Sequence, residues 1–121
     1  MLFRSCRVAD QLRLTRDLLA QNIETPAALR KIGTSGWVVH TVAAAAYCFL
    51  ASPRDFERSV IAAVMGGDDA DTTAAVTGAI SGAFNGEEAI PARWREQVER
   101  GDEIRASALK LYDMVSGAPV A

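Results

Sequence analysis

The residue types best suited to chemistry lie in one acidic turn near the middle of the chain, Gly66-Gly67-Asp68-Asp69-Ala70-Asp71-Thr72-Thr73. Three carboxylates within four residues repel one another, so something must offset their charge. A helix N-terminus provides part of that compensation, and a bound divalent cation provides more. The oxygen donors of Asp69, Asp71 and Thr72 suit Mg²⁺, Mn²⁺ or Ca²⁺ rather than zinc or copper.

Backbone geometry decides whether these side chains can converge. Residues two apart on a helix point about 200° apart, so Asp69 and Asp71 cannot meet inside a regular helix. They can meet if Asp69 lies in the turn and Asp71 at the helix cap, and the preceding glycines allow the sharp bend. The alternative is that these carboxylates, with Asp68, are only N-caps on a solvated turn. An EF-hand fits poorly, because its glycine and glutamate positions are occupied by Ala74 and Ile80.

The elements that must position this turn are all predicted to be helices. Apolar residues recur at helical spacing, and no segment shows the sustained alternation of a strand. We therefore predict an all-α fold, a compact orthogonal array of about seven helices with short connections. Thr25 and Ser52 are expected as N-caps, each followed by a proline. The expected helices are about 5–21, 26–32, 36–51, 53–65, one ending near 84, one opening at 91, and one from 102 to 114.

The segment from Ile32 to Pro53 contains no Lys, Arg, Asp or Glu and is apolar almost all round. Its uninterrupted apolar part is shorter than the ~20 residues that a membrane-spanning helix needs, so we predict a buried central helix. We expect His40 on this helix to be a core histidine with a satisfied hydrogen bond rather than a catalyst. Trp37 and Trp94 are also expected in the core.

The helix after the acidic turn carries Gly78, Gly82 and Gly86, spaced four apart. A glycine inside a helix costs up to about 1 kcal/mol relative to alanine, which is tolerable where another backbone approaches closely. We therefore expect this face to pack against another helix backbone. Where the face is uncovered, it would favour self-association.

Composition excludes several classes of function. With 121 residues, 50% of them hydrophobic, the chain is expected to form a single domain over 1–121. A net charge of −2 argues against nucleic-acid and membrane partners. One histidine and two cysteines, Cys6 and Cys48, exclude a two-histidine metal site, a zinc ribbon and a disulfide scaffold within one chain. The N-terminus has no secretory signal, so the cytoplasm is the expected location by default.

The run from Gly67 to Gly78, followed by Gly82-Ala83 and Gly86, resembles the C-terminal signature of the ADP-ribosylglycohydrolases. This is the family of the dinitrogenase-reductase-activating glycohydrolase. The flanking stretches 33–41, 47–50, 55–64 and 89–94 are also similar to the family. The resemblance covers roughly residues 25–115 and is most specific at the acidic turn.

The resemblance implies an all-helical enzyme with two adjacent Mg²⁺ or Mn²⁺ ions. Such an enzyme hydrolyses the glycosidic bond between ADP-ribose and a protein side chain or a related small molecule. By position, Asp69, Asp71 and Thr72 match metal ligands of the family, with Asp69 and Asp71 in the catalytic role. In such a site, the cations hold the ribose hydroxyls and polarise a water for attack at the anomeric carbon. The segment Ser35-Gly36-Trp37 is expected to lie near the bound ADP-ribose.

The chain also departs from the family pattern. The family has an early Thr-Asp-Asp cluster with an upstream glutamate, and no Thr-Asp-Asp precedes residue 66 here. The resemblance therefore implies the C-terminal part of such an enzyme, with the N-terminal half missing and only part of the dinuclear site present. An N-terminal complementing chain or self-association would complete the site. The alternatives are a catalytically inactive truncated or degenerate fragment that binds a cation weakly, and an interaction module unrelated to ADP-ribose.

Overall fold

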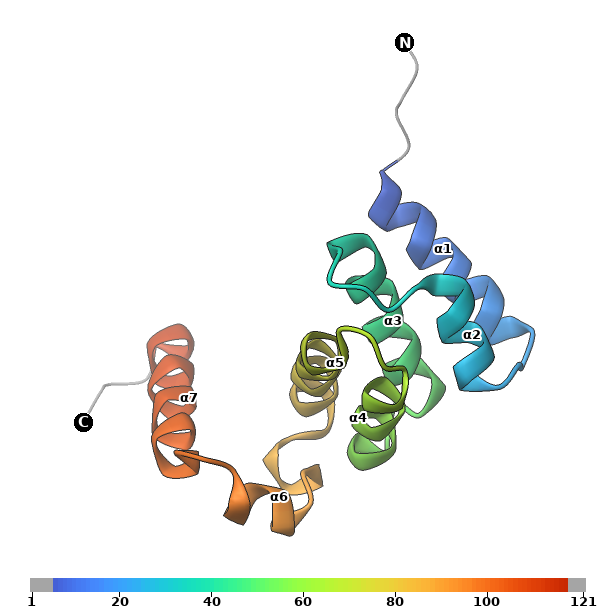
Figure 1. Cartoon of the computed structure of the whole chain (residues 1–121). Helices are drawn as coiled ribbons and strands as arrows, with labels where there is room; N and C mark the ends of the chain where they lie inside the picture. Colours follow the sequence, from blue (N-terminus) through green and yellow to red (C-terminus); the bar gives the residue numbers. More distant parts are fainter. Residues whose placement is uncertain (1–5, 118–121) are drawn as a thin grey trace. The chain divides into compact units, whose positions relative to one another are not determined.

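The computed structural model describes residues 6–117, and every regular element within them is helical (Figure 1). The prediction of an all-α fold with about seven helices is therefore confirmed. The elements are α1 (Arg7–Ala20), α2 (Thr25–Ile32), α3 (Val38–Ala51), α4 (Phe56–Met65), α5 (Ala70–Asn85), the short 3₁₀ helix η1 (Glu87–Ala89), α6 (Ala92–Gln97) and α7 (Gly101–Ser116).

The chain divides into two compact units, with the boundary between Ile90 and Pro91. The first unit contains α1 to α5 and η1, and it carries all of the predicted site residues. The second contains α6 and α7, which contact each other only slightly and have no buried residues. Trp94 of α6 is only partly buried, with the guanidinium of Arg93 5.4 Å from its ring centroid, so it is not the core residue that we expected. The expectation of one domain over 1–121 stays a prediction.

Helix α3 lies at the centre of the first unit, where it contacts α1, α2, α4 and α5 (Figure 1). Its Ala43, Ala44 and Ala45 are completely buried, and Tyr47 and Cys48 are almost so. Alanine lets neighbouring helices approach closely on several sides, which explains why an apolar helix with few large side chains can be central. The prediction of a buried central helix is confirmed. Within residues 6–117, none of the helices has the length and hydropathy needed to span a membrane.

Two predicted N-caps are wrong. Thr25 is already inside α2, and Glu24 occupies the cap position. Helix α4 is capped by Asp55, whose carboxylate accepts a hydrogen bond from the backbone N–H of Arg58 at 2.9 Å. Ser52 instead ends α3. Ser52 and Asp55 can both cap a helix. Because α4 begins only at Phe56, Asp55 is the residue that occupies its N-cap position.

Within the described part of the chain, no backbone of another helix lies close to the glycines inside α5. A Cβ on Gly78 would lie 3.7 Å from Val60 and 3.8 Å from Phe56, and one on Gly82 would lie 3.7 Å from Phe56. These are ordinary contacts with side chains of α4, so the expected backbone approach is wrong. Gly86 ends the helix with a φ of +84° and has no neighbour within 4 Å of a built Cβ. Self-association stays a prediction, without support from this glycine face.

Candidate functional site

The acidic turn connects α4 to α5 through two residues in the left-handed conformation. Gly67 has a φ of +70° and Asp68 a φ of +54°, a conformation that glycine adopts freely and aspartate tolerates. The turn places Asp69 at the N-cap of α5, with non-helical backbone angles of −82° and 57°. Asp71 therefore lies inside the first helical turn, whereas we had expected it at the cap.

The three predicted metal ligands come together at this helix end. The hydroxyl of Thr72 donates to Oδ1 of Asp69 at 3.0 Å, and Oδ1 of Asp71 accepts from the backbone N–H of Thr72 at 2.9 Å. Interaction with the neighbouring Asp69 side chain lowers the pKa of Asp71, and the hydrogen bond from the N–H of Thr72 lowers this pKa further. The carboxyl groups meet because Asp69 is outside the helix, where the 200° separation does not apply.

Helix capping does not account for the position of Asp69. Its side chain makes no capping hydrogen bond to a backbone N–H of α5, although it occupies the N-cap. Its Oδ1 instead accepts from the hydroxyl of Thr72. Asp69 is half-buried, whereas Asp68, Asp71 and Thr72 are exposed. The carboxylate of Asp69 is thus held by the Thr72 hydroxyl while the side chain stays partly exposed to solvent.

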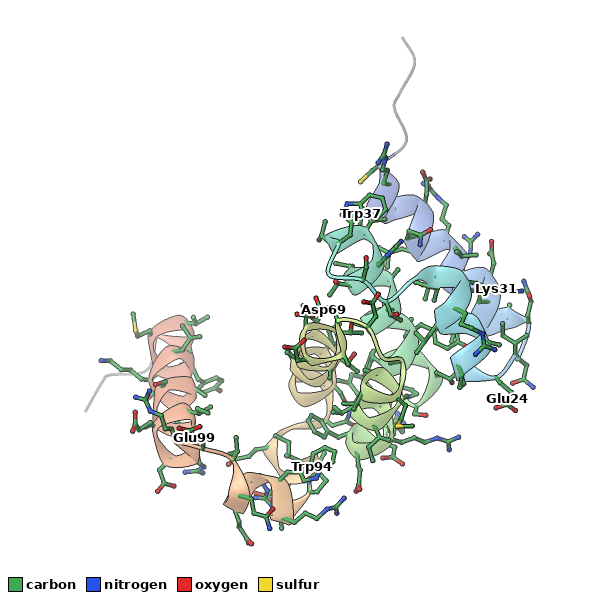
Figure 2. The ribbon with its side chains drawn as sticks, viewed as in Figure 1. Glu24, Lys31, Trp37, Asp69, Trp94 and Glu99 are labelled. Carbon is green, nitrogen blue, oxygen red and sulfur yellow. The ribbon has the colours of Figure 1, made fainter. Side chains whose placement is uncertain are left out.

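A second segment packs directly against Asp69. The backbone N–H of Asp69 donates to the carbonyl oxygen of Thr34 at 3.1 Å. A Cβ added to Gly36 would lie 2.6 Å from Oδ2 of Asp69, so the carboxylate occupies the space that any other residue at position 36 would need. Figure 2 labels Asp69 at the start of α5 and Trp37 in the loop before α3. The structure therefore brings the predicted ADP-ribose segment, residues 35–37, to the predicted metal ligands.

His40 contacts two residues of this loop. Its Nδ1 lies 2.7 Å from Oγ of Ser35, and the rings of His40 and Trp37 meet edge to face with centroids 5.1 Å apart. The hydroxyl of Thr41 donates to the carbonyl oxygen of Ser35 at 3.2 Å. His40 is hydrogen-bonded as expected but only partly buried. Trp37 is 46% exposed, with the guanidinium of Arg7 5.7 Å from its ring centroid, so the expectation that it lies in the core is wrong.

Sequence reasoning missed the contributions of Thr34 and His40. Thr34 acts through its backbone carbonyl, which every residue type possesses, so no side-chain signal was available. His40 was recognised as a hydrogen-bonded residue, but its partner is five residues earlier, in a loop whose path the sequence does not specify. A serine five residues before a histidine is too common a pattern to predict their contact.

The donor set is suitable for a hard cation but incomplete. Carboxylate and hydroxyl oxygens are the ligands that Mg²⁺ and Mn²⁺ favour. Throughout residues 6–117, however, no group of three or more His, Cys, Asp or Glu side chains is arranged to hold a metal ion. Three donors from Asp69, Asp71 and Thr72 would not fill the six positions of an octahedral ion, so a cation here would also need water or further protein groups.

Comparison with known proteins identifies relatives of this chain. The model of the family described as ADP-ribosylglycohydrolase matches residues 2–119. An uncharacterised protein of Archaeoglobus fulgidus is 36% identical over 107 residues, which cover 88% of this chain and 33% of that protein. The ADP-ribosylarginine hydrolase Tri1 of Pseudomonas putida is 35% identical over 83 residues, which cover 69% of this chain and 22% of that enzyme.

A mammalian protein is also similar. The ADP-ribosylhydrolase ARH3 of Mus musculus is 29% identical over 115 residues, covering 86% of this chain and 31% of that enzyme. The chain thus spans a third or less of the length of these three relatives. No solved structure gives a significant match.

Proposed function

Because the chain belongs to the ADP-ribosylglycohydrolase family, we propose that it contributes part of a cation-dependent hydrolytic site. The reaction is cleavage of the glycosidic bond between ADP-ribose and a protein side chain or a related small molecule. The observation that carries the proposal is the convergence of Asp69, Asp71 and Thr72 directly beside the loop of residues 35–37.

Asp69, Asp71 and Thr72 are the residues that would hold Mg²⁺ or Mn²⁺. The side chains of Asp69 and Asp71 lie close enough for Asp69 to lower the pKa of Asp71. A shared cation would offset the repulsion between the two carboxylates when both are ionised. When bound, the cation supplies Lewis acidity to a water or to sugar hydroxyls. The hydroxyl of Thr72 and the backbone of Gly36 orient the carboxylate of Asp69 before any ligand arrives, which lowers the cost of binding.

The loop beside the carboxylates is suited to binding the nucleotide portion of the substrate. A purine stacked on the half-exposed indole of Trp37 would displace the guanidinium of Arg7 or lie on the ring face opposite it. Ser35 and Gly36 connect this face to Asp69, so a ligand along the loop would extend from the indole to the carboxylates. These positions support a role for Ser35, Gly36 and Trp37 in binding ADP-ribose.

We further propose that another polypeptide segment completes the site. The donor set is partial, and the relatives are at least three times as long as the part that matches this chain. The missing ligands would come from a segment equivalent to the remainder of the relatives, either on a separate complementing chain or on a second copy of this one. A cytoplasmic location stays a prediction.

The test measures release of ADP-ribose from an ADP-ribosylated arginine peptide in MgCl₂. The chain is assayed alone and mixed with the non-matching portion of the Archaeoglobus fulgidus relative. We expect turnover only in the mixture, and Asp69→Asn or Asp71→Asn should abolish it. Asp68→Asn is the matched control, because Asp68 is in the same turn but outside the hydrogen-bonded cluster, and it should retain activity.

The incomplete donor set also favours a second candidate, an inactive fragment with weak cation binding. This candidate predicts no turnover with any complementing segment and equal Mg²⁺ binding by the Asp68→Asn and Asp69→Asn variants. Calorimetric titration with MgCl₂ distinguishes the two, because the active site that we propose requires tighter binding by Asp68→Asn than by Asp69→Asn.

A further inference from the structure

We propose that His40 is a positioning residue that fixes the loop Gly33–Trp37 against Asp69 and thereby orients the Asp69 carboxylate. The geometric part of this inference stands on contacts within the first compact unit. Its consequence for cation and ADP-ribose binding rests on the function proposed above.

The hydroxyl of Ser35 connects His40 to the loop. Its Oγ lies 2.7 Å from Nδ1 of His40 and also accepts the backbone N–H of Trp37 at 3.3 Å. A serine hydroxyl can donate one hydrogen bond and accept others, so Ser35 can bond to the imidazole nitrogen and to the backbone N–H of Trp37 at the same time. The hydrogen bond fixes the middle of the loop to α3.

The imidazole ring also packs against both ends of the loop. Gly33 has a φ of +96°, and a Cβ there would lie 2.7 Å from three atoms of the His40 ring. At the other end, the Trp37 ring meets His40 edge to face. One side chain therefore contacts the beginning, middle and end of the loop. The backbone that carries His40 is held in the core, because the next turn of α3 contains the completely buried Ala43 and Ala44.

The loop in turn makes two contacts with Asp69. The carbonyl oxygen of Thr34 accepts the Asp69 N–H, and Gly36 provides the surface against which Oδ2 lies. If the loop moved away, the Asp69 amide would lose its partner and the carboxylate would gain rotational freedom. His40 touches neither carboxylate of the turn in this scheme. It acts through Ser35 and the loop backbone, so it positions Asp69 without being a catalytic residue.

Amide hydrogen exchange measured by NMR tests the geometric part without a ligand. The Asp69 amide reports the contact between loop and turn, and the Thr73 amide, which donates to the carbonyl oxygen of Asp69 at 3.1 Å, reports the start of α5. Loss of one hydrogen bond should raise Asp69 exchange about fivefold or more in Ser35→Ala and His40→Ala. The Thr73 amide should change by less than about twofold.

His40→Asn separates positioning from simple packing. An asparagine amide occupies nearly the same place as Nδ1 and retains the bond to Ser35, although the ring is lost. We expect it to restore most of the Asp69 protection that His40→Ala removes. Unchanged Asp69 exchange in both Ser35→Ala and His40→Ala would overturn the inference. Equal exchange in His40→Asn and His40→Ala would overturn the hydrogen-bond route.

Calorimetric titration of the same variants with MgCl₂, followed by ADP-ribose, tests the consequence for binding. Ser35→Ala and His40→Ala should weaken binding about fivefold, and His40→Asn should restore it. If the unmodified chain and its complemented mixture bind neither probe, the proposed function fails. The exchange experiment still decides the positioning role of His40, so the two failures are distinguishable.

Discussion

Oδ2 of Asp69 lies only 2.6 Å from the position that a Cβ on Gly36 would take. This contact joins the acidic turn to the loop before α3, two segments far apart in the sequence. The turn predicted to bind a cation and the loop predicted to contact ADP-ribose are therefore adjacent within the first compact unit.

Gly36→Ala is expected to weaken Mg²⁺ binding while leaving the fold intact. The new methyl group would displace the end of a flexible side chain, so the cost in stability should remain within about 1 kcal/mol. The displaced carboxylate would lose its orientation toward Asp71 and Thr72, and we expect about tenfold weaker binding by calorimetric titration. Gly78→Ala is the matched control, because its methyl group would make only ordinary contacts with α4. Equal affinity in the two variants would contradict the role assigned to Gly36.

Thr72→Val should reduce cation affinity with little change in stability. The substitution preserves the shape of the side chain but removes the hydroxyl that donates to Asp69 at 3.0 Å and that we assign as a ligand. Thr72 is exposed, so we expect the free energy of unfolding to change by less than about 0.5 kcal/mol. Thr72→Ser retains the hydroxyl and should bind Mg²⁺ like the unmodified chain. Identical titration curves for the valine and serine variants would exclude the hydroxyl from the site.

Gly78→Ala and Gly82→Ala should each stabilise the chain. A Cβ at either position meets side chains of α4 at ordinary distances of 3.7 Å or more, so the change gains helix propensity without a clash. We expect about 0.5–1 kcal/mol for each, measured by urea unfolding. Gly86→Ala should destabilise, because its φ of +84° is unfavourable for alanine. A loss of stability in Gly78→Ala would show that α5 lies closer to α4 than described.

The stability of the chain should fall at alkaline pH because of Cys48. Burial raises the pKa of this thiol from 9.0 to about 11. Because the pKa of Cys48 is higher in the folded than in the unfolded chain, its contribution to the free energy of unfolding is complete below pH 9. That contribution is lost as the pH rises through about 11. The loss attributable to this group is up to about 2–3 kcal/mol. Urea unfolding between pH 8 and 11 measures it.

Cys48→Ala provides the control for that pH dependence. It should flatten the decline in this range, although Tyr47, whose pKa is also raised by burial, leaves a residual slope. If the free energy of unfolding fell equally with pH in the unmodified chain and in Cys48→Ala, the decline could not be assigned to Cys48. The same burial predicts that Cys6, which is exposed, reacts with a thiol reagent in the folded chain whereas Cys48 does not.

The helices were predictable because helical periodicity and helix-ending glycines are local properties. Helix α3 was placed at the centre because it is apolar on every side, and Ala43 and Ala44 are indeed completely buried. The N-caps of α2 and α4 were less predictable. Thr25 and Ser52 have suitable side chains, but the chain path gives the cap positions to Glu24 and Asp55.

The helical fold, the family and the grouping of Asp69, Asp71 and Thr72 could be predicted from residue patterns, because periodicity, motif and spacing are properties of neighbouring residues. Three other relations could not: Gly36 lies against Asp69, His40 bonds Ser35, and Trp37 is exposed. These relations depend on how α3, α4 and α5 pack. The packing brings together the loop before α3 and the turn before α5, and backbone groups such as the Thr34 carbonyl then form contacts that no side-chain pattern encodes.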